Sequence, residues 1–201
     1  MFKGSSFWIG ILALLILGTA CSTDPRFNRE TQYLGAGGHI IKRPSAETVD
    51  NVSYWDGDGI SGKPSIRISL GEQRAYFYKN NELVGVSLVS TGREGFGTKP
   101  GSFKIIQKDK DHKSSLYGDY TDTAGNVLQK DIEVSKDPKP PGAVFDGAKM
   151  PYFMRIVGGT GMHAGFLPGY PASHGCIRMP LFMAEAFFNN VSTGTPVAIT
   201  P

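Results

Sequence analysis

Short runs of alternating apolar and polar residues are the main pattern of the chain from about residue 64 onward. Such alternation is typical of strands that bury one face. Turn residues separate the runs at Gly71-Glu72 and at residues 79–82. The pattern predicts four strands, at residues 65–70, 73–78, 83–90 and 102–107. Closely spaced short strands favour an antiparallel β-sandwich or barrel, so the expected fold class is mainly β.

Three other stretches depart from this alternation. Residues 181–188, which follow Pro180, are predicted to form one short C-terminal helix. Residues 108–149 are polar, with strand-like pieces at best, and are expected to run as a long excursion over the surface. A loop of that length on a compact domain is more often functional than decorative. The aromatic stretch 150–156 is either a strand lining a cleft or a part of the core.

Composition narrows the class of protein. The chain has 201 residues, of which 40% are hydrophobic, enough for one folded domain with a core. It contains 21 Lys and Arg against 18 Asp and Glu and has no basic run, so a nucleic-acid partner is not expected. The 26 Gly and 13 Pro favour a turn-rich, strand-based fold. Two cysteines, Cys21 and Cys176, exclude a disulfide scaffold and a four-cysteine zinc site.

The first twenty residues have the features of an export signal. Lys3 supplies a positive charge, residues 7–17 form an apolar run, and the small residues 18–20 precede Cys21. The run is short for a membrane span, which needs about 20 apolar residues. The segment resembles a bacterial lipoprotein signal, in which the cysteine after the cut is lipidated, although Gly18 stands where Leu is usual. Plain secretion and an uncleaved anchor remain alternatives, and all three place the domain outside the cytoplasm.

Residues 21–62 are poor in apolar periodicity and rich in turn-forming clusters. They are expected to be a flexible tether, with the folded domain at residues 63–201. The sequence Asp-Gly-Asp-Gly at residues 56–59 suggests calcium, but the later acidic ligands of an EF-hand loop are absent.

Candidate chemistry is concentrated between Gly158 and Pro180. If Cys21 is lipidated, Cys176 is the single free thiol of an exported protein, in which cysteines are normally paired or avoided. A small buried core residue is the alternative role, but a Gly-rich, His-flanked loop is poor core material. A thiolate nucleophile needs an imidazole base and electropositive surroundings. The candidates for these roles are His163, His174 and Arg178.

A zinc site is the competing interpretation of the same residues. His163, His174 and Cys176 would supply three ligands and leave one position open. Their spacing does not fit one rigid element, and no nearby carboxylate offers support to a ligating histidine. Neither a metal nor another cofactor is expected.

The sequence Ser-His-Gly-Cys-Ile-Arg at residues 173–178 resembles the signature of L,D-transpeptidases with the YkuD-type catalytic domain. Residues 161–165, Gly-Met-His-Ala-Gly, match the upstream histidine segment of that family. Residues 88–92 and 98–103 resemble its Ser-Thr-Gly and Thr-Pro-x-Gly segments, so the likeness covers roughly residues 64–201. One departure is that nine residues separate His163 from Ser173, fewer than is usual, which implies a shortened loop beside the site.

The resemblance implies a role for each matched residue. Cys176 would attack the stem-peptide carbonyl that precedes the terminal D-Ala of peptidoglycan, with His163 as general base. The carbonyl of Ala164 would orient His163, and the N–H groups of Gly175 and Cys176 would form an oxyanion hole. The residues grouped as oxyanion or orienting residues are Ser173, His174, Ala164 and Gly175.

Several roles remain open at this level. His174 either has a structural or substrate-orienting role or takes part in a second proton transfer. Arg178 holds the loop or a substrate carboxylate, or is a surface residue. An amine acceptor, such as the side chain of diaminopimelate, gives transpeptidation, whereas water gives an L,D-carboxypeptidase. The same residues fit a hydrolase that detaches proteins from peptidoglycan. A wall-binding protein with an inactive enzyme fold is disfavoured by the intact Cys176 and His163. The expected location is the periplasmic face of a bacterial membrane, through a lipid on Cys21, or otherwise the periplasm or cell wall.

The lipid anchor yields a direct prediction. Cys21→Ser should release the protein from the membrane fraction, because the thiol that carries the lipid is gone, while the activity of the purified protein should be unchanged. Fractionation followed by immunoblotting measures the release. Retention of the variant in membranes would point instead to an uncleaved span.

Overall fold

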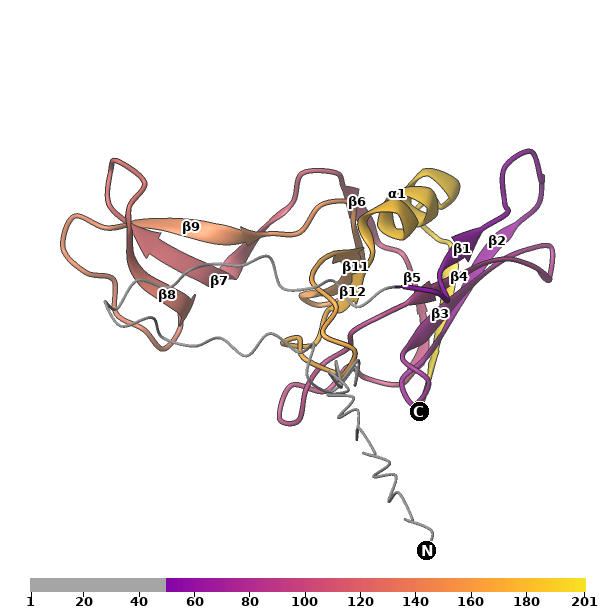
Figure 1. Ribbon diagram of the computed structural model, residues 1–201, viewed down its shortest axis with the longest axis horizontal. Coiled ribbons are helices and arrows are strands. Elements are labelled where there is room, and N and C mark those ends of the chain that lie inside the picture. The colour runs from indigo at the N-terminus through magenta and orange to yellow at the C-terminus, as the bar shows by residue number, and fades with distance from the viewer. Residues whose placement is uncertain (1–49) are drawn as a thin grey trace, which may run out of the picture. The chain divides into compact units, whose positions relative to one another are not determined.

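The computed structural model describes residues 50–201, within which there are thirteen strands and one helix (Figure 1). In chain order the elements are β1 (Tyr54–Trp55), β2 (Pro64–Ser69), β3 (Arg74–Lys79), β4 (Glu82–Leu88), β5 (Gly101–Lys104), β6 (Gln107–Asp109), β7 (Lys113–Thr121), β8 (Val127–Glu133), β9 (Val144–Lys149), β10 (Phe153–Val157), β11 (Thr160–Ala164), β12 (Ile177–Met179), α1 (Leu181–Asn190) and β13 (Pro196–Thr200). The predicted signal at residues 1–20, Cys21 and residues 22–49 of the predicted tether lie outside the described residues.

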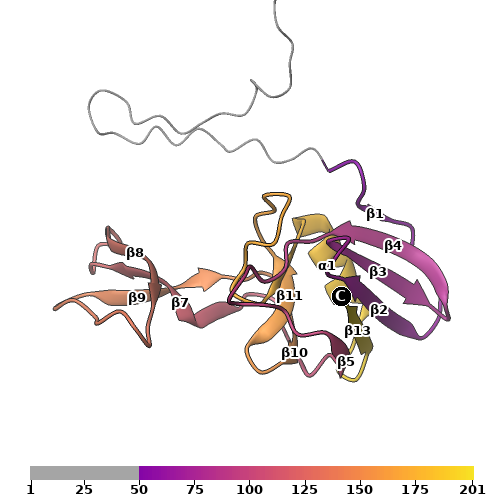
Figure 2. The same cartoon turned by 90° about the horizontal axis from the view of Figure 1, so that it is seen from below.

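Two sheets and the helix enclose the main core. The six-stranded sheet has the order β1-β4-β3-β2-β13-β5, and the four-stranded sheet has the order β12-β11-β10-β6. In both views β11 lies between β7 on one side and the strands β2–β4 on the other (Figures 1 and 2). Fully buried side chains from both sheets and from α1 form one cluster that includes Phe77, Met154, Met162, Ile177 and Phe187. The expectation of a mainly β fold with one short helix is confirmed.

The strand pairing is antiparallel with two exceptions among the described strands. β13 pairs with β2 in parallel, and β11 pairs with β12 in parallel. Each parallel pair joins strands that are far apart in the sequence or separated by a long connection, which alternation along one strand cannot reveal. The second pair carries the candidate chemistry.

The helix α1 packs on the core through one face. Met183, Ala184 and Phe187 are buried, and Phe187 follows the other two by four and three residues, the spacings that place side chains on the same side of a helix. Its N-cap is Pro180, which makes no side-chain capping hydrogen bond. Packing of the apolar face therefore holds this helix in place, and the predicted helix extends two residues further, to Asn190.

The strand predicted at residues 102–107 is divided between two sheets. β5 ends at Lys104, and Ile105 then donates its N–H to the Thr195 carbonyl at 2.9 Å. The next residue, Ile106, donates to the Arg155 carbonyl at 2.9 Å. The chain thus crosses from the six-stranded to the four-stranded sheet at these two residues, while the alternation continues unbroken through the crossing.

Folded structure begins earlier than residue 63. β1 pairs with β4, and the Trp55 ring packs edge-on against Phe77, with 5.0 Å between the ring centroids. The Lys79 ammonium donates to the carbonyls of Gly57 and Ile60, at 2.8 Å each. Residues 54–62 of the predicted tether therefore pack on the six-stranded sheet. A two-residue strand followed by turns is too short to show periodicity, which explains the difference.

Residues 108–149 form ordered sheet rather than an irregular excursion. β7, β8 and β9 make a three-stranded antiparallel sheet with the order β8-β7-β9. Tyr120, Ile132 and Ala143 are buried in its small core, with Phe145 packed against them. A Cβ atom on Gly147 would lie 2.0 Å from the Ser114 carbonyl oxygen, so this close approach of backbones requires glycine. Few residues are buried here, and the hydrophobic signal in the sequence is correspondingly weak.

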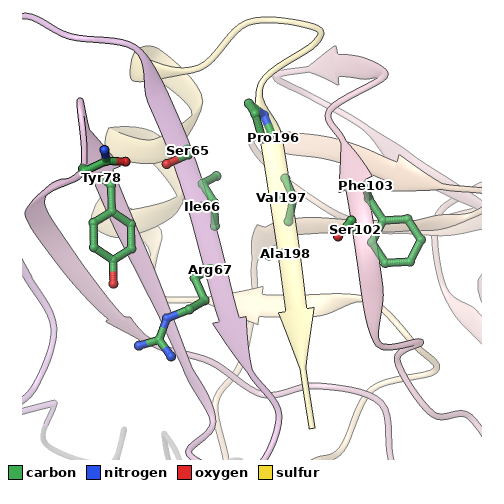
Figure 3. Close-up of a pocket in the computed structure, with 10 residues that line it drawn as sticks. Ser65, Ile66, Arg67, Tyr78, Ser102, Phe103, Pro196, Val197 and Ala198 are labelled. Atoms are coloured by element: carbon green, nitrogen blue, oxygen red, sulfur yellow. The ribbon is translucent and has the colours of Figure 1, made fainter.

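A shallow pocket of about 360 Å³ lies across β2, β3, β13 and β5 on the six-stranded sheet (Figure 3). On the same sheet, the Arg67 guanidinium lies 4.4 Å from the centre of the Tyr76 ring. Neither histidine nor cysteine lines this pocket, so the candidate chemistry is located elsewhere.

The packing of β1 predicts the effect of two neighbouring substitutions. Trp55→Ala should lower the free energy of unfolding by about 3 kcal/mol, because it removes an aromatic side chain that packs on the core. Tyr54→Ala, in the same strand but with an exposed side chain, should change it by less than about 0.5 kcal/mol. Urea denaturation measures both values. Equal, small effects would mean that residues 54–62 contribute little to the fold.

Candidate active site

One cavity of about 820 Å³ brings together most of the residues selected from the sequence. It is bounded on one side by β10, β11 and the loop before β12, and on the other by the three-stranded sheet. The sequence-predicted residues that line it are His163, Ser173, His174, Cys176 and Arg178. Ala164 and Gly175 are buried beside the cavity and are not part of its lining.

The parallel pairing of β11 and β12 places Cys176. Met162 is opposite Ile177 and His163 is opposite Arg178, so Cys176 enters the sheet level with Gly161. The Gly161 N–H hydrogen-bonds the sulfur. The sulfur also lies 3.6 Å from the Gly159 carbonyl oxygen, to which the thiol donates. Cys176 is free and partly exposed, so its sulfur is held at the edge of the sheet and accessible from the cavity.

The loop before Cys176 is fixed by two hydroxyl groups. The Ser173 Oγ accepts the Gly175 N–H at 3.0 Å and donates to the Cys176 carbonyl. The Thr98 Oγ1 donates to the Gly175 carbonyl at 2.8 Å and accepts the Gly92 N–H at 2.9 Å. Gly175 has φ of +111°, a left-handed conformation that glycine adopts without strain.

This arrangement bears on the predicted oxyanion hole. The Gly175 N–H, one of its two expected donors, is used by the Ser173 hydroxyl. The remaining donor of the predicted pair is the N–H of Cys176 itself. The sequence motif shows which residues are adjacent, whereas the direction of each N–H depends on the turn that the loop adopts.

His163 is a buried, neutral imidazole. Its side chain is 6% exposed, and its Nδ1 lies 2.8 Å from the Ala164 carbonyl oxygen. A carbonyl oxygen only accepts hydrogen bonds, so Nδ1 carries the proton and Nε2 carries a lone pair. Burial lowers the pKa of His163 to about 4. Near neutral pH the ring is therefore unprotonated at Nε2 and able to accept a proton. The Ala164 carbonyl is thus placed to orient His163, which is the role that the family resemblance implies for it.

The Cys176 thiol is also neutral at rest. Burial raises its pKa, and the Gly161 N–H and the charges of Arg178 and Arg155 counteract only part of that effect. A thiol in this state needs a base before it reacts as a nucleophile. A neutral thiol and a neutral imidazole in one cavity satisfy that requirement.

His174 is held differently. Its Nε2 lies 2.7 Å from an Nη atom of Arg93, a group that only donates, so the Nε2 lone pair is already engaged. The ring stacks on Tyr117, with 4.2 Å between the ring centroids. Burial and the charges of Arg93 and Arg178 lower the pKa of His174. These contacts disfavour proton acceptance by His174 and favour an orienting role.

Arg178 connects the site to the segment that follows β4. Its N–H and carbonyl exchange hydrogen bonds of 3.0 Å each with Ser90. A Cβ atom on Gly165 would lie 3.1 Å from the Arg178 Cγ, so the stem of the side chain packs against that glycine. The side chain lines the cavity. Backbone anchoring and a charge facing the cavity therefore occur in the same residue.

The aromatic stretch 150–156 has both predicted properties at once. Met150 and Arg155 line the cavity, whereas Met154 and Ile156, on the other face of β10, are buried in the main core. The two alternatives drawn from the sequence describe opposite faces of β10 and the turn before it.

Three residues near His174 were not selected from the sequence. Arg93 and Phe96 lie between residues 88–92 and 98–103, the two segments that resemble the family. This position in the sequence was the one feature that could have pointed to them. Tyr117 lies in the polar stretch 108–149, where nothing in the sequence distinguished it. Its proximity to His174 depends on how the three-stranded sheet meets the loop before β12.

Two further features concern residues 50–201. Within this part of the chain, no three side chains of His, Cys, Asp or Glu form a group suited to a metal ion. The same residues contain no helix with the length and apolar character that a membrane span requires.

Solved structures with a similar fold are L,D-transpeptidases. A protein from Stackebrandtia nassauensis is 17% identical, with a TM-score of 0.51 over 71% of this chain and 57% of the other. One from Mycobacterium smegmatis is 17% identical, with a TM-score of 0.51 over 69% of this chain and 59% of the other. An L,D-transpeptidase in complex with imipenem is 18% identical, with a TM-score of 0.51 over 69% of this chain and 59% of the other. This chain thus spans less than two thirds of the length of these proteins, and the likeness establishes the fold.

No curated protein matches this sequence. The family model for the L,D-transpeptidase catalytic domain, YkuD, matches residues 63–199. Because this match covers more than half of the 201-residue chain, and the fold agrees with it, the protein belongs to the YkuD L,D-transpeptidase family.

Proposed function

We propose that this protein is a cysteine-dependent L,D-transpeptidase that acts on peptidoglycan stem peptides through a thioester. One observation supports this proposal more than any other. Cys176 and His163 line the same cavity, and the Ala164 carbonyl fixes the His163 tautomer so that Nε2 is free to accept a proton. The cavity volume of about 820 Å³ is in the upper part of the range for small-molecule sites.

The first half of the reaction forms the acyl-enzyme. His163 Nε2 takes the proton of the Cys176 thiol, and the sulfur attacks the carbonyl that joins the third residue of the stem to D-Ala. The nearby charges of Arg178 and Arg155 stabilise the thiolate as it forms. When the tetrahedral adduct collapses, the C–N bond breaks, and the His163 imidazolium gives its proton to the departing amine. D-Ala leaves, and a thioester remains.

The second half transfers the acyl group. An amine of a second stem peptide attacks the thioester carbonyl, and His163 takes a proton from that amine. The C–S bond then breaks, and the His163 imidazolium returns the proton to the departing Cys176 sulfur. The product is a link between the third residues of two stems. If water attacks instead, the same steps make an L,D-carboxypeptidase, and if the amide cleaved joins a protein to the stem, they make a hydrolase.

We further propose that the protein is exported and anchored on the periplasmic face of the membrane by a lipid on Cys21. The supporting features are the charge at Lys3, the apolar run at residues 7–17 and the small residues before Cys21. A domain placed there has direct access to peptidoglycan.

Analysis of the products distinguishes the three reactions. The purified protein would be incubated separately with tetrapeptide muropeptides, with crosslinked sacculi and with protein-linked muropeptides, and the products identified by mass spectrometry. We expect release of D-Ala and formation of dimers joined through their third residues. Tripeptides without dimers would indicate a carboxypeptidase, and free protein with a cleaved muropeptide would indicate the hydrolase.

The nucleophile is tested by a single substitution. Cys176→Ala should abolish both D-Ala release and the covalent adduct with a carbapenem, the class of the imipenem found in one structural relative, because Cys176 is the only cysteine among residues 50–201 and lines the cavity. Intact-protein mass spectrometry measures the adduct. An adduct of the same added mass on the Ala variant would disprove the assignment.

The two histidines are expected to differ in kind. His163→Ala should lower the rate of acylation by about two powers of ten or more near neutral pH, because the thiol loses its base. Raising the pH beyond the ordinary thiol value of about 8.5 should recover part of this loss, since solvent then supplies the thiolate. Stopped-flow measurement of acylation across this range records both effects.

His174→Ala is the matched comparison. Because the His174 Nε2 is engaged by Arg93, this variant should lose less activity and show no recovery at high pH. A larger, pH-rescued defect in His174→Ala than in His163→Ala would exchange the two roles.

A further inference from the structure

We propose that Arg93 and Tyr117 are positioning residues for His174, and that they fix its imidazole as a neutral ring whose Nδ1–H faces the substrate. The inference rests on the proposed function, because the substrate in question is the stem peptide that acylates Cys176. It gives His174 a defined task and assigns two residues to the site that the sequence motif does not contain.

Arg93 determines the tautomer of His174. The guanidinium donates to Nε2 at 2.7 Å, and a guanidinium has no lone pair to offer in return. The ring proton therefore resides on Nδ1. Among residues 50–201 no group accepts a hydrogen bond from that Nδ1, and His174 is exposed and lines the cavity that holds Cys176. A carbonyl or carboxylate oxygen of a peptide is the kind of group that this donor would bind.

Aromatic contacts on two sides determine the plane of the ring. Tyr117, on β7, stacks on the His174 ring with an interplanar angle of 22°. Phe96 meets it edge-on, with 4.8 Å between the centroids and an angle of 78°. The Arg93 guanidinium lies 4.5 Å from the centre of the Phe96 ring, so it is itself held in place. The imidazole is thus oriented by two segments, residues 93–96 and β7, that both lie far from His174 in the sequence.

The charges around the ring differ in sign. Arg93 and Arg178 oppose protonation of His174, whereas Glu133 and Asp131, on the three-stranded sheet, favour it. Lys136 forms an ion pair with Glu133 at 2.8 Å and lies 5.8 Å from the centre of the Phe96 ring. If the Arg93 charge were removed, the balance would shift toward the imidazolium, and the two carboxylates would attract the ring away from its stack on Tyr117.

The contact also joins the three-stranded sheet to the loop that carries the nucleophile. Tyr117 reaches across the cavity to His174, which lies two residues before Cys176. Substitutions at Tyr117 or Arg93 should therefore alter substrate binding more than the chemical step, since neither side chain provides the base or the nucleophile.

The test compares four variants of the full chain. Arg93→Ala removes the charge and the donor, Arg93→Lys keeps the charge, Tyr117→Phe keeps the ring, and Tyr117→Ala removes it. Arg67→Ala is the matched control, because it also deletes an arginine that packs on a tyrosine ring. Arg67 lines the shallow pocket on the six-stranded sheet, not the cavity that holds Cys176 (Figure 3). The readouts are the NMR titration of the His174 ring and the pH dependence of kcat and KM for D-Ala release from a tetrapeptide stem.

We expect the His174 ring to titrate at higher pH in Arg93→Ala than in the parent protein, because a neighbouring positive charge is lost. Arg93→Lys and Arg67→Ala should leave the titration near that of the parent protein. Near pH 5.5 the KM of Arg93→Ala should rise by about two- to tenfold with little change in kcat, because the imidazolium turns toward Glu133 and Asp131 and its hydrogen bond to the substrate is lost. At pH 7.5 and above the rise should be smaller but not zero, since the neutral ring returns to its stack on Tyr117 while its proton is no longer confined to Nδ1.

Tyr117→Ala should raise KM by about two- to tenfold. Tyr117→Phe should keep the KM of the parent protein, because the stacked ring rather than the hydroxyl holds the imidazole. An unchanged His174 titration in Arg93→Ala would overturn the proposal. So would a loss in Arg93→Ala that is the same at every pH, or a Tyr117→Phe variant as impaired as Tyr117→Ala. If the parent protein releases no D-Ala, the proposed function fails, and the NMR titration still decides the role of Arg93.

Discussion

The parallel pairing of β11 with β12 is the constraint on which the site depends. It sets Cys176 level with Gly161, whose N–H hydrogen-bonds the sulfur, and sets His163 opposite Arg178 in the same ladder. A shift of one residue in this register would turn the side chains of β12 to the opposite face of the sheet. The hydroxyls of Ser173 and Thr98 then fix the turn that delivers Cys176 to the strand. Core residues on both strands, Met162 and Ile177, keep the register in place.

Burial gives the site its electrostatic character. His163 and Cys176 are both shifted toward their neutral forms, so the resting site contains no ion pair that would have to be desolvated. The charges that would favour a thiolate, Arg178 and Arg155, act from the cavity side. His174 is not expected to accept the proton of the thiol, because Arg93 donates a hydrogen bond to its Nε2. Under the proposed function, the two histidines close to this thiol serve different purposes: His163 moves a proton and His174 orients the substrate.

Local chemistry was predictable from the sequence, and long-range placement was not. The alternation at residues 65–70 and 73–78 predicted β2 and β3, and the Gly-rich, His-flanked surroundings of Cys176 pointed to residues that line one cavity in the structure. Trp55 was missed because a two-residue strand has no period, and β7–β9 were missed because their core contains few buried residues. The oxyanion assignment for Gly175 depended on the direction of an N–H, which follows from the Ser173 hydrogen bond and not from the motif. Tyr117 lies at the site only because the three-stranded sheet places β7 beside the loop that contains His174.

The central claim is that a neutral His163 deprotonates a neutral Cys176 thiol, and the ionisation of the free enzyme tests it most directly. NMR of the His163 ring, combined with ultraviolet absorbance of the Cys176 thiolate, would follow both groups from about pH 3 to about pH 10. We expect a ring protonated at Nδ1 alone near neutral pH, titrating near pH 4, and a thiolate that appears only at alkaline pH. An imidazolium at His163 together with a thiolate at Cys176 near pH 7 would contradict it.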